Sequence, residues 1–216
     1  MRLQLIVLTI ATALVTPLIA DTERLKDATL VLTEMAGAGD AGIPTSLLNK
    51  AKCVVVVPSL KKVALGIGGQ YGRGYLSCRS GGGWSAPGGL RVEGGSFGLQ
   101  IGASATDVIL LVMNDRGVEK LLSSQFKVGA DAAVAAGPVG REASAQTDIT
   151  MRAEMLAWSR SRGVYAGIAL QGSTIRQDTG ENKELYGREI ANKEVVSGKV
   201  TVPPAATDFI KALSKY

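Results

Sequence analysis

The residues in this sequence most suited to chemistry are seven cations with no carboxylate among them. No acidic residue lies between Asp40 and Glu93, and Trp84 stands near a turn in this glycine-rich stretch. Of the 23 basic residues that follow Arg2, 16 therefore remain outside the stretch, against 19 acidic residues. Local positive charge of this kind favours an anionic ligand, and the alternative is a solvated charged face. The seven cations are Lys50, Lys52, Lys61, Lys62, Arg73, Arg79 and Arg91.

Catalytic chemistry has few candidates in this chain. The absence of histidine removes the commonest general base, metal ligand and triad member. A serine nucleophile beside a lysine, such as Ser59 with Lys61, is no better supported than a turn serine beside solvated lysines. Asp107, Asp131 and Asp148 stand at predicted strand boundaries, where aspartate commonly caps or turns. We therefore predict a non-enzymatic protein with no metal site and no cofactor.

The glycines do not form a recognisable phosphate-binding loop. The segment 66–72 departs from G-x-G-x-x-G because Tyr71 occupies the position of the third glycine, and no Gly-Lys-Ser/Thr follows. A nucleic-acid surface would need stacking aromatic residues, and the chain has only three Phe, two Trp and five Tyr. We predict no nucleic-acid partner.

The N-terminal residues have the pattern of an export signal. Arg2 precedes the apolar run Leu3–Val15, Pro17 ends the run, and Ala20 precedes an acidic residue. This predicts a signal peptide over residues 1–20, cleaved after Ala20. The alternative is an uncleaved anchor, but the run is shorter than the roughly 20 residues that a membrane-spanning helix needs. We expect a periplasmic or secreted protein with peripheral membrane association.

Cys53 and Cys78 are the only cysteines in the chain. An even number of cysteines in an oxidising compartment indicates a disulfide, which would stabilise the fold by roughly 3–4 kcal/mol through the loop that it closes. The alternative is two buried free thiols.

The remaining patterns predict one α+β domain over residues 21–216. Fourteen of the 27 glycines lie between Gly66 and Gly102, which favours a bent antiparallel sheet system, barrel- or sandwich-like. Helices are predicted at the N-terminus, in the middle and at the C-terminus, over 21–36, 46–51, 115–124 and 205–215. Strands are predicted over 53–57, 63–78, 90–103 and 107–113. Two hairpins are predicted, one pairing 127–136 with 141–151 and the other pairing 153–160 with 163–175.

Eight short motifs, in order and at matching spacing, resemble the SYLF domain family. The resemblance covers residues 21–190, the core of the domain, and leaves the segment with the final helix as an extension. The motifs are Ala51–Pro58, Gly68–Gly74, Gly83–Pro87, Gly94–Gly102, Gly129–Ala132, Ala136–Arg141, Trp158–Gly167 and Tyr186-Gly187.

The resemblance implies a lipid-binding module. Eukaryotic SYLF members bind phosphoinositides and some associate with cortical actin, whereas bacterial members resemble this chain in having an export signal and a similar cysteine pair. In eukaryotic members a basic amphipathic segment near the N-terminus contributes to membrane contact. The corresponding region here, residues 21–52, has its cations offset by carboxylates that include Glu23, Asp27, Glu34 and Asp40. We therefore assign that role instead to Lys50, Lys52, Lys61 and Lys62. Phosphatidylglycerol, cardiolipin or lipid A would be the ligands in an envelope.

Charge by itself would bind such a membrane weakly. Each Lys or Arg near an anionic surface contributes about 1 kcal/mol, so three or four of them give only millimolar-range affinity. Apolar burial, from Trp84 or from the helix that begins at Asp21, would have to add to it. We predict lipid-binding residues Lys50, Lys52, Lys61, Lys62, Arg73, Arg79 and Trp84. The alternatives are a structural or scaffolding envelope protein that binds a protein partner, and a small outer-membrane barrel, which the charged helical C-terminus disfavours.

Overall fold

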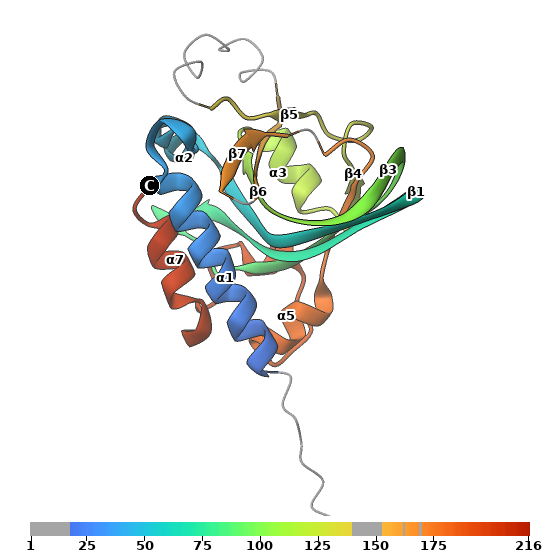
Figure 1. The fold of residues 1–216 in the computed structure, drawn as a ribbon. Coiled ribbons are helices and arrows are strands. Elements are labelled where there is room, and N and C mark those ends of the chain that lie inside the picture. Colours follow the sequence, from blue (N-terminus) through green and yellow to red (C-terminus); the bar gives the residue numbers. More distant parts are fainter. Residues whose placement is uncertain (1–17, 140–152, 162, 169) are drawn as a thin grey trace, which may run out of the picture.

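A computed structural model describes residues 18–139, 153–161, 163–168 and 170–216. The strands form a curled sheet, and helices pack around it (Figure 1). The helices are α1 Leu18–Gly37, η1 Gly39–Ala41, α2 Thr45–Lys50, α3 Asp115–Leu121, α5 Thr179–Tyr186, α6 Asn192–Val195, η3 Pro204–Ala206 and α7 Thr207–Leu213. The strands are β1 Cys53–Ser80, β2 Gly83–Trp84, β3 Gly88–Val112, β4 Gln125–Lys127, β5 Val134–Ala136, β6 Met155–Ser161, β7 Val164–Gly167 and β8 Thr174–Gln177.

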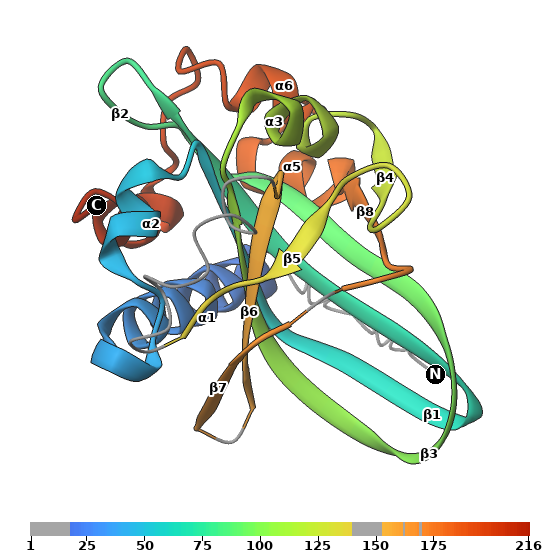
Figure 2. The same ribbon diagram turned by 90° about the horizontal axis from the view of Figure 1, so that it is seen from above.

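The centre of the fold is a long two-stranded ribbon made by β1 and β3. The strands pair antiparallel from Cys53 opposite Val112 to Leu76 opposite Gly88, with a register shift near Leu65. Cys53 and Cys78 are 25 residues apart in β1. A straight strand, at roughly 3.3 Å per residue, would place them about 80 Å apart. The two Cα atoms are instead 3.9 Å apart. The ribbon therefore bends back on itself at its middle, and Figure 2 shows the bend beyond the rest of the sheet.

Two glycines allow the two halves of β1 to approach each other. A Cβ atom on Gly74 would lie 2.1 Å from the carbonyl oxygen of Val56, and one on Gly72 would lie 2.9 Å from the side chains of Val57 and Leu60. Both distances are too short for any side chain, so larger residues would push the halves of the ribbon apart. The glycines predicted to mark bends and close backbone approach do mark them.

The ribbon buries both of its faces near the disulfide end. Val54 and Val56 belong to the cluster that α1, α2 and α7 cover, whereas Val55 and Val57 belong to the cluster inside the curled sheet with Leu121 of α3. Successive side chains of a strand point to opposite faces, so a strand that is buried on both faces needs a continuous apolar run. This explains the unbroken valine segment of β1. We call the helix-covered side the outer face and the other side the inner face.

The α+β class and the main helices are as predicted, but two details of the sheet are not. β5 does not form a hairpin with the segment that follows it; it pairs in parallel with β6, with Val134 opposite Met155. The predicted partner, 141–151, lies outside the described residues. The expected strand 163–175 is two strands, because only β7 forms the predicted hairpin with β6, while β8 pairs with β3 and β4. The sheet is therefore mixed.

The predicted signal peptide lies outside the described residues except for its last three positions, which form the start of α1. No helix in the described part of the chain is long and apolar enough to cross a membrane. The apolar side of α1 packs on the sheet through residues that are almost completely buried, namely Leu25, Ala28, Val31, Leu32 and Met35.

Candidate functional site

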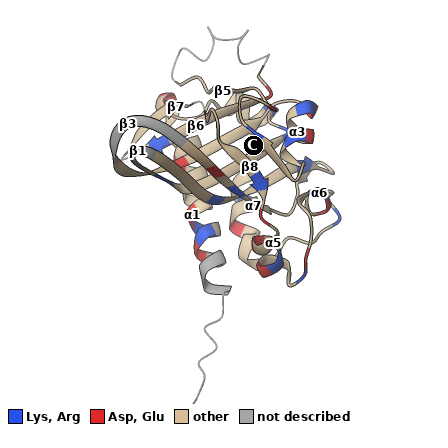
Figure 3. Ribbon diagram, turned by 90° about the vertical axis from the view of Figure 1, so that its right-hand side faces the viewer, with Lys and Arg blue, Asp and Glu red and all other residues tan. Residues whose placement is uncertain are grey.

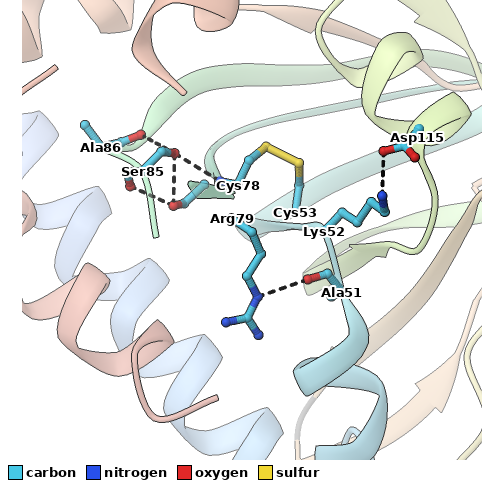
Figure 4. Close-up of a disulfide and its surroundings, with 9 residues drawn as sticks. Ala51, Lys52, Cys53, Cys78, Arg79, Ser85, Ala86 and Asp115 are labelled. Carbon is cyan, nitrogen blue, oxygen red and sulfur yellow. Dashed lines mark hydrogen bonds and ion pairs between the residues drawn. A yellow bond between two sulfur atoms is a disulfide. The ribbon is translucent and has the colours of Figure 1, made fainter. Parts of the chain in front are cut away.

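The predicted disulfide between Cys53 and Cys78 is present and joins the two ends of β1 (Figure 4). Beside it, the backbone N–H of Arg79 donates to the carbonyl oxygen of Lys52 at 2.8 Å, and Ser85 Oγ accepts from the N–H of Cys78 at 3.1 Å. These bonds secure the end of the ribbon that lies opposite the bend.

Arg79 and Trp84, both predicted to bind lipid, are occupied by contacts within the protein. The Arg79 guanidinium donates to the carbonyl oxygens of Asn49 and Ala51 at the C-terminal end of α2, at 3.3 and 3.4 Å, and to that of Tyr216 at 2.7 Å. It also lies 4.3 Å from the centroid of the Trp84 ring. Trp84 is only 8% exposed, so in this fold its indole is part of the core and is not presented to a membrane.

Arg73 lies in a group that we call the buried ion-pair cluster, consisting of Arg24, Arg73, Tyr75, Asp178 and Glu181. Arg73 Nε is 2.7 Å from Asp178 Oδ2, and its Nη2 is 2.9 Å from Glu181 Oε2. Arg24 of α1 donates to Glu181 at 2.5 and 2.6 Å, and the Tyr75 hydroxyl donates to the same carboxylate. Glu181 is fully buried, so the cluster ties α1, β1 and α5 together.

The electrostatics of the buried ion-pair cluster favour the charged forms of Asp178 and Arg73. Burial by itself would raise the pKa of Asp178. Hydrogen bonds from Arg73 and from the N–H of Glu181 lower the pKa by more than burial raises it, so it lies below its ordinary value. Burial would lower the pKa of Arg73, and the hydrogen bond to Asp178 with the charge of Glu181 raises it instead. Both carboxylates pair with Arg73, which lies in the acid-free stretch of the sequence.

The four predicted lysines are exposed but lie in different places. Lys52 pairs with Asp115 at 2.6 Å, whereas Lys50, Lys61 and Lys62 have no ion pair among the described residues. Lys50 is the last residue of α2, whereas the other two belong to β1. Lys61 and Lys62 are consecutive in β1, just before the bend, so their side chains point to opposite sides of the ribbon.

The bend also carries an apolar side chain and a cleft. Val63, next to Lys62, is 53% exposed. Lys61 lines a cleft of about 350 Å³ between α1 and β1, together with Arg24 and the exposed Tyr71. We call Lys61, Lys62 and Val63 the bend surface, because these three combine free positive charge with exposed apolar area.

Sequence reasoning missed one grouping of cations. Arg91 of β3 and Arg176 of β8 lie directly opposite each other and share the carboxylate of Glu93, at 2.9 and 3.4 Å from their Nε atoms. We call these three residues the arginine row. Arg91 was counted in the basic stretch, but nothing in the sequence indicated a partner 85 positions away.

These features define a single α+β domain with a curled, ribbon-based sheet. The chain belongs to the Ysc84 family, whose description is "Las17-binding protein actin regulator", and the family pattern matches residues 93–216. The resemblance to the SYLF family is thereby confirmed.

Curated relatives extend the match to most of the chain. It is 32% identical over 180 residues to Protein YSC84 of Saccharomyces cerevisiae, which covers 81% of this chain and 38% of the relative. It is 28% identical over 179 residues to SH3 domain-containing YSC84-like protein 1 of Bos taurus, covering 82% of this chain and 52% of the relative. The chain thus spans roughly half or less of these relatives. None of these descriptions names an enzymatic reaction.

Proposed function

We propose that this protein binds anionic phospholipid head groups at a membrane of the cell envelope through the bend surface. The observation that carries the proposal is the bend surface itself, in which two exposed lysines without ion pairs among the described residues stand beside an exposed valine in β1, just before the bend. Figures 1 and 2 show the bend of the β1–β3 ribbon reaching beyond the body of the fold. From the predicted export signal we expect the protein in the periplasm or outside the cell, where phosphatidylglycerol, cardiolipin and lipid A would be the anionic ligands.

The geometry of the ribbon explains how two oppositely directed lysines can serve one surface. Lys61 and Lys62 point to opposite sides of the ribbon, so a membrane that met one face would reach only one of them. A membrane that met the ribbon end-on, at the bend, would reach both. Each lysine contributes about 1 kcal/mol, and burial of Val63 adds up to about 1.5 kcal/mol. The expected affinity is therefore weak, and it depends on charge and apolar contact together.

Flotation with vesicles tests this proposal. The mature protein should float with vesicles of phosphatidylglycerol and phosphatidylcholine and not with phosphatidylcholine alone, and high salt should weaken the binding. Replacing both Lys61 and Lys62 by Glu should reduce binding about thirtyfold or more, because two cations at about 1 kcal/mol each are lost and two anions are added. Val63→Ser should cause a smaller loss that persists at high salt.

A matched control is available at the other side of the fold. Lys193 and Lys199 are exposed lysines without ion pairs among the described residues, so replacing both by Glu makes the same change in net charge away from the bend. This control should bind nearly as well as the unaltered protein. Equal losses in the two double variants, or equal binding to neutral and anionic vesicles, would refute the proposal.

A protein partner is the second candidate function. It is supported by the names of the relatives, which include LAS seventeen-binding protein 3 of Saccharomyces cerevisiae, 30% identical over 192 residues and covered over 41% of its length. Capture of one specific envelope protein by the chain, with no affinity for anionic vesicles, would favour this scaffolding role over lipid binding.

A further inference from the structure

The arginine row occupies the outer face of the sheet, away from the bend. Leu90 and Val92 of β3 and Ile175 of β8 point into the inner cluster. Arg91 and Arg176 alternate with them, so both lie on the opposite face. Because the two arginines are directly opposed on neighbouring strands, their side chains emerge side by side.

The charges of the arginine row are not balanced among the described residues. Glu93 is the single carboxylate paired with both arginines among these residues, with one of its oxygens toward each Nε, so one negative charge faces two positive charges. Like charges directly opposite each other destabilise a sheet. Glu93 offsets only one of the two positive charges at this position, and each arginine side chain is still 34% exposed.

Neighbouring strands extend this positive surface. On one side Arg91 lies opposite Arg73 of β1, whose charge is balanced by the buried ion-pair cluster. On the other side Arg176 lies opposite Gln125 of β4 and donates to its side-chain oxygen at 2.6 Å. The exposed Lys127 follows two residues later on the same face of β4. Figure 3 shows blue segments, which mark Lys and Arg, on β8 and on strands beside it.

We propose that the arginine row binds a phosphate group. Neighbouring strands are about 4.8 Å apart, so two guanidinium groups in register can each direct N–H donors to a different oxygen of one phosphate. Arginine offers such donors in a planar fork that suits phosphate oxygens. A bound phosphate would add the negative charge that the single carboxylate of Glu93 cannot supply to two arginines. This site uses none of the bend-surface residues and does not depend on the membrane proposal.

The test compares the Tm of the full chain in two solutions. One contains millimolar inorganic phosphate, and the other contains sodium chloride at equal ionic strength. Phosphate should raise the Tm of the unaltered protein above its value in chloride. Arg176→Gln should bind phosphate about tenfold more weakly, since one set of charge-assisted hydrogen bonds is lost. Its Tm in chloride should equal or exceed that of the unaltered protein, because Arg91 and Glu93 are left as a balanced pair. A purely structural arginine would show the reverse pattern, with a lower Tm and an unchanged phosphate effect.

Two further variants keep the test decisive. Arg176→Lys retains the positive charge but lacks the planar guanidinium, so phosphate should raise its Tm by less than it raises that of the unaltered protein. This variant replaces Arg176→Gln in the test if Arg176→Gln does not fold. Lys193→Gln removes one exposed cation elsewhere and should leave the phosphate effect intact. The proposal is overturned if chloride stabilises the protein as much as phosphate does, or if Arg176→Gln and Lys193→Gln respond equally to phosphate.

A second arm identifies where the phosphate comes from. Soluble glycerol phosphate is a phosphomonoester and phosphatidylglycerol is a phosphodiester, and both present anionic phosphate oxygens, one in solution and the other at a vesicle surface. If Arg176→Gln loses phosphate stabilisation and also floats less with vesicles, the site binds a lipid head group. If it loses phosphate stabilisation and floats normally, the site binds a soluble phosphate compound. Failure of the bend surface in flotation would leave the phosphate result unaffected, so the two proposals can fail separately.

Discussion

The buried ion-pair cluster and the arginine row lie side by side on the same sheet and differ in how their arginines are balanced. Arg73 and Arg91 are direct cross-strand neighbours. Arg73 has two carboxylates of its own, Asp178 and Glu181, both buried. Arg91 shares one exposed carboxylate with a second arginine. Two cations from one acid-free stretch therefore have different roles, one in holding the fold together and one available to a ligand.

The position of α5 explains the difference. Asp178 caps this helix by accepting from the N–H of Glu181 at 3.1 Å, and its own N–H donates to the carbonyl oxygen of Gly89 at 2.9 Å. These bonds fix the first turn of α5 against β3, so that its two carboxylates reach Arg73. A basic residue thus stabilises the fold when carboxylates from an element distant in sequence lie next to it, whatever the charge of its neighbours in sequence.

The largest expected effect is the loss of the central carboxylate of the buried ion-pair cluster. Glu181→Gln leaves Arg24 and Arg73 with one fewer anion in a buried setting, and removing one partner of such a pair is costly. Because both arginines keep some solvent contact, we expect a loss of about 2–4 kcal/mol in the free energy of unfolding, measured with urea. Glu184→Gln, an exposed position on the same helix, should change it by less than about 0.5 kcal/mol. Similar values for the two variants would show that the cluster does not stabilise the fold.

A smaller effect is expected from acid. The pKa of Asp178 is depressed in the folded protein, so the unfolded chain binds a proton first as pH falls. Its contribution is present above the ordinary aspartate pKa of about 3.9 and is lost as pH falls through the lower folded value. Urea unfolding between pH 7 and pH 3 should therefore show a steeper loss of stability in the unaltered protein than in Asp178→Asn. The arginine row has no such buried carboxylate. Arg176→Gln should therefore leave the dependence of unfolding free energy on pH unchanged. Identical slopes for the unaltered protein and Asp178→Asn would contradict the assignment.

The smallest stability effect is expected in the arginine row. Glu93→Gln removes an exposed carboxylate that two arginines share, and exposed ion pairs contribute at most about 1 kcal/mol. The same change should strengthen phosphate binding several-fold, because the competing anion is gone. Thermal unfolding with and without phosphate measures both results. If Glu93→Gln destabilised the protein as much as Glu181→Gln, or weakened phosphate binding, the contrast between the two regions would be lost.

Local features were predictable because they depend on residues that are close in sequence. The apolar spacing of α1 and α7, the turn between β6 and β7, and the asparagine cap of α3 all arise within a few positions. The disulfide followed from the number of cysteines. The order of the short motifs also identified the SYLF family, because motifs are recognised from residue types along the chain and require no knowledge of contacts.

Long-range pairing was not predictable from the same patterns. Short strands such as β5 and β8 carry too few residues to specify a partner, so the parallel pairing of β5 and the placement of β8 beside β3 were missed. The roles of Arg73, Arg79 and Arg91 depend on groups 85 to 137 positions away. The lipid-binding role of Lys61 and Lys62 stays a prediction, now tied to a defined surface.

The sequence by itself determined the class of the domain, its family, its disulfide and the concentration of positive charge before Glu93. Only the tertiary structure decided which of those charges are available to a ligand. The physical reason is that the net charge of a segment is a sum over neighbours in the chain, whereas the state of each cation depends on burial and on carboxylates brought to it through space. Bending of the β1–β3 ribbon and the register of β8 determine those distances, and so they separate Lys61, Lys62 and the arginine row from Arg73 and Arg79.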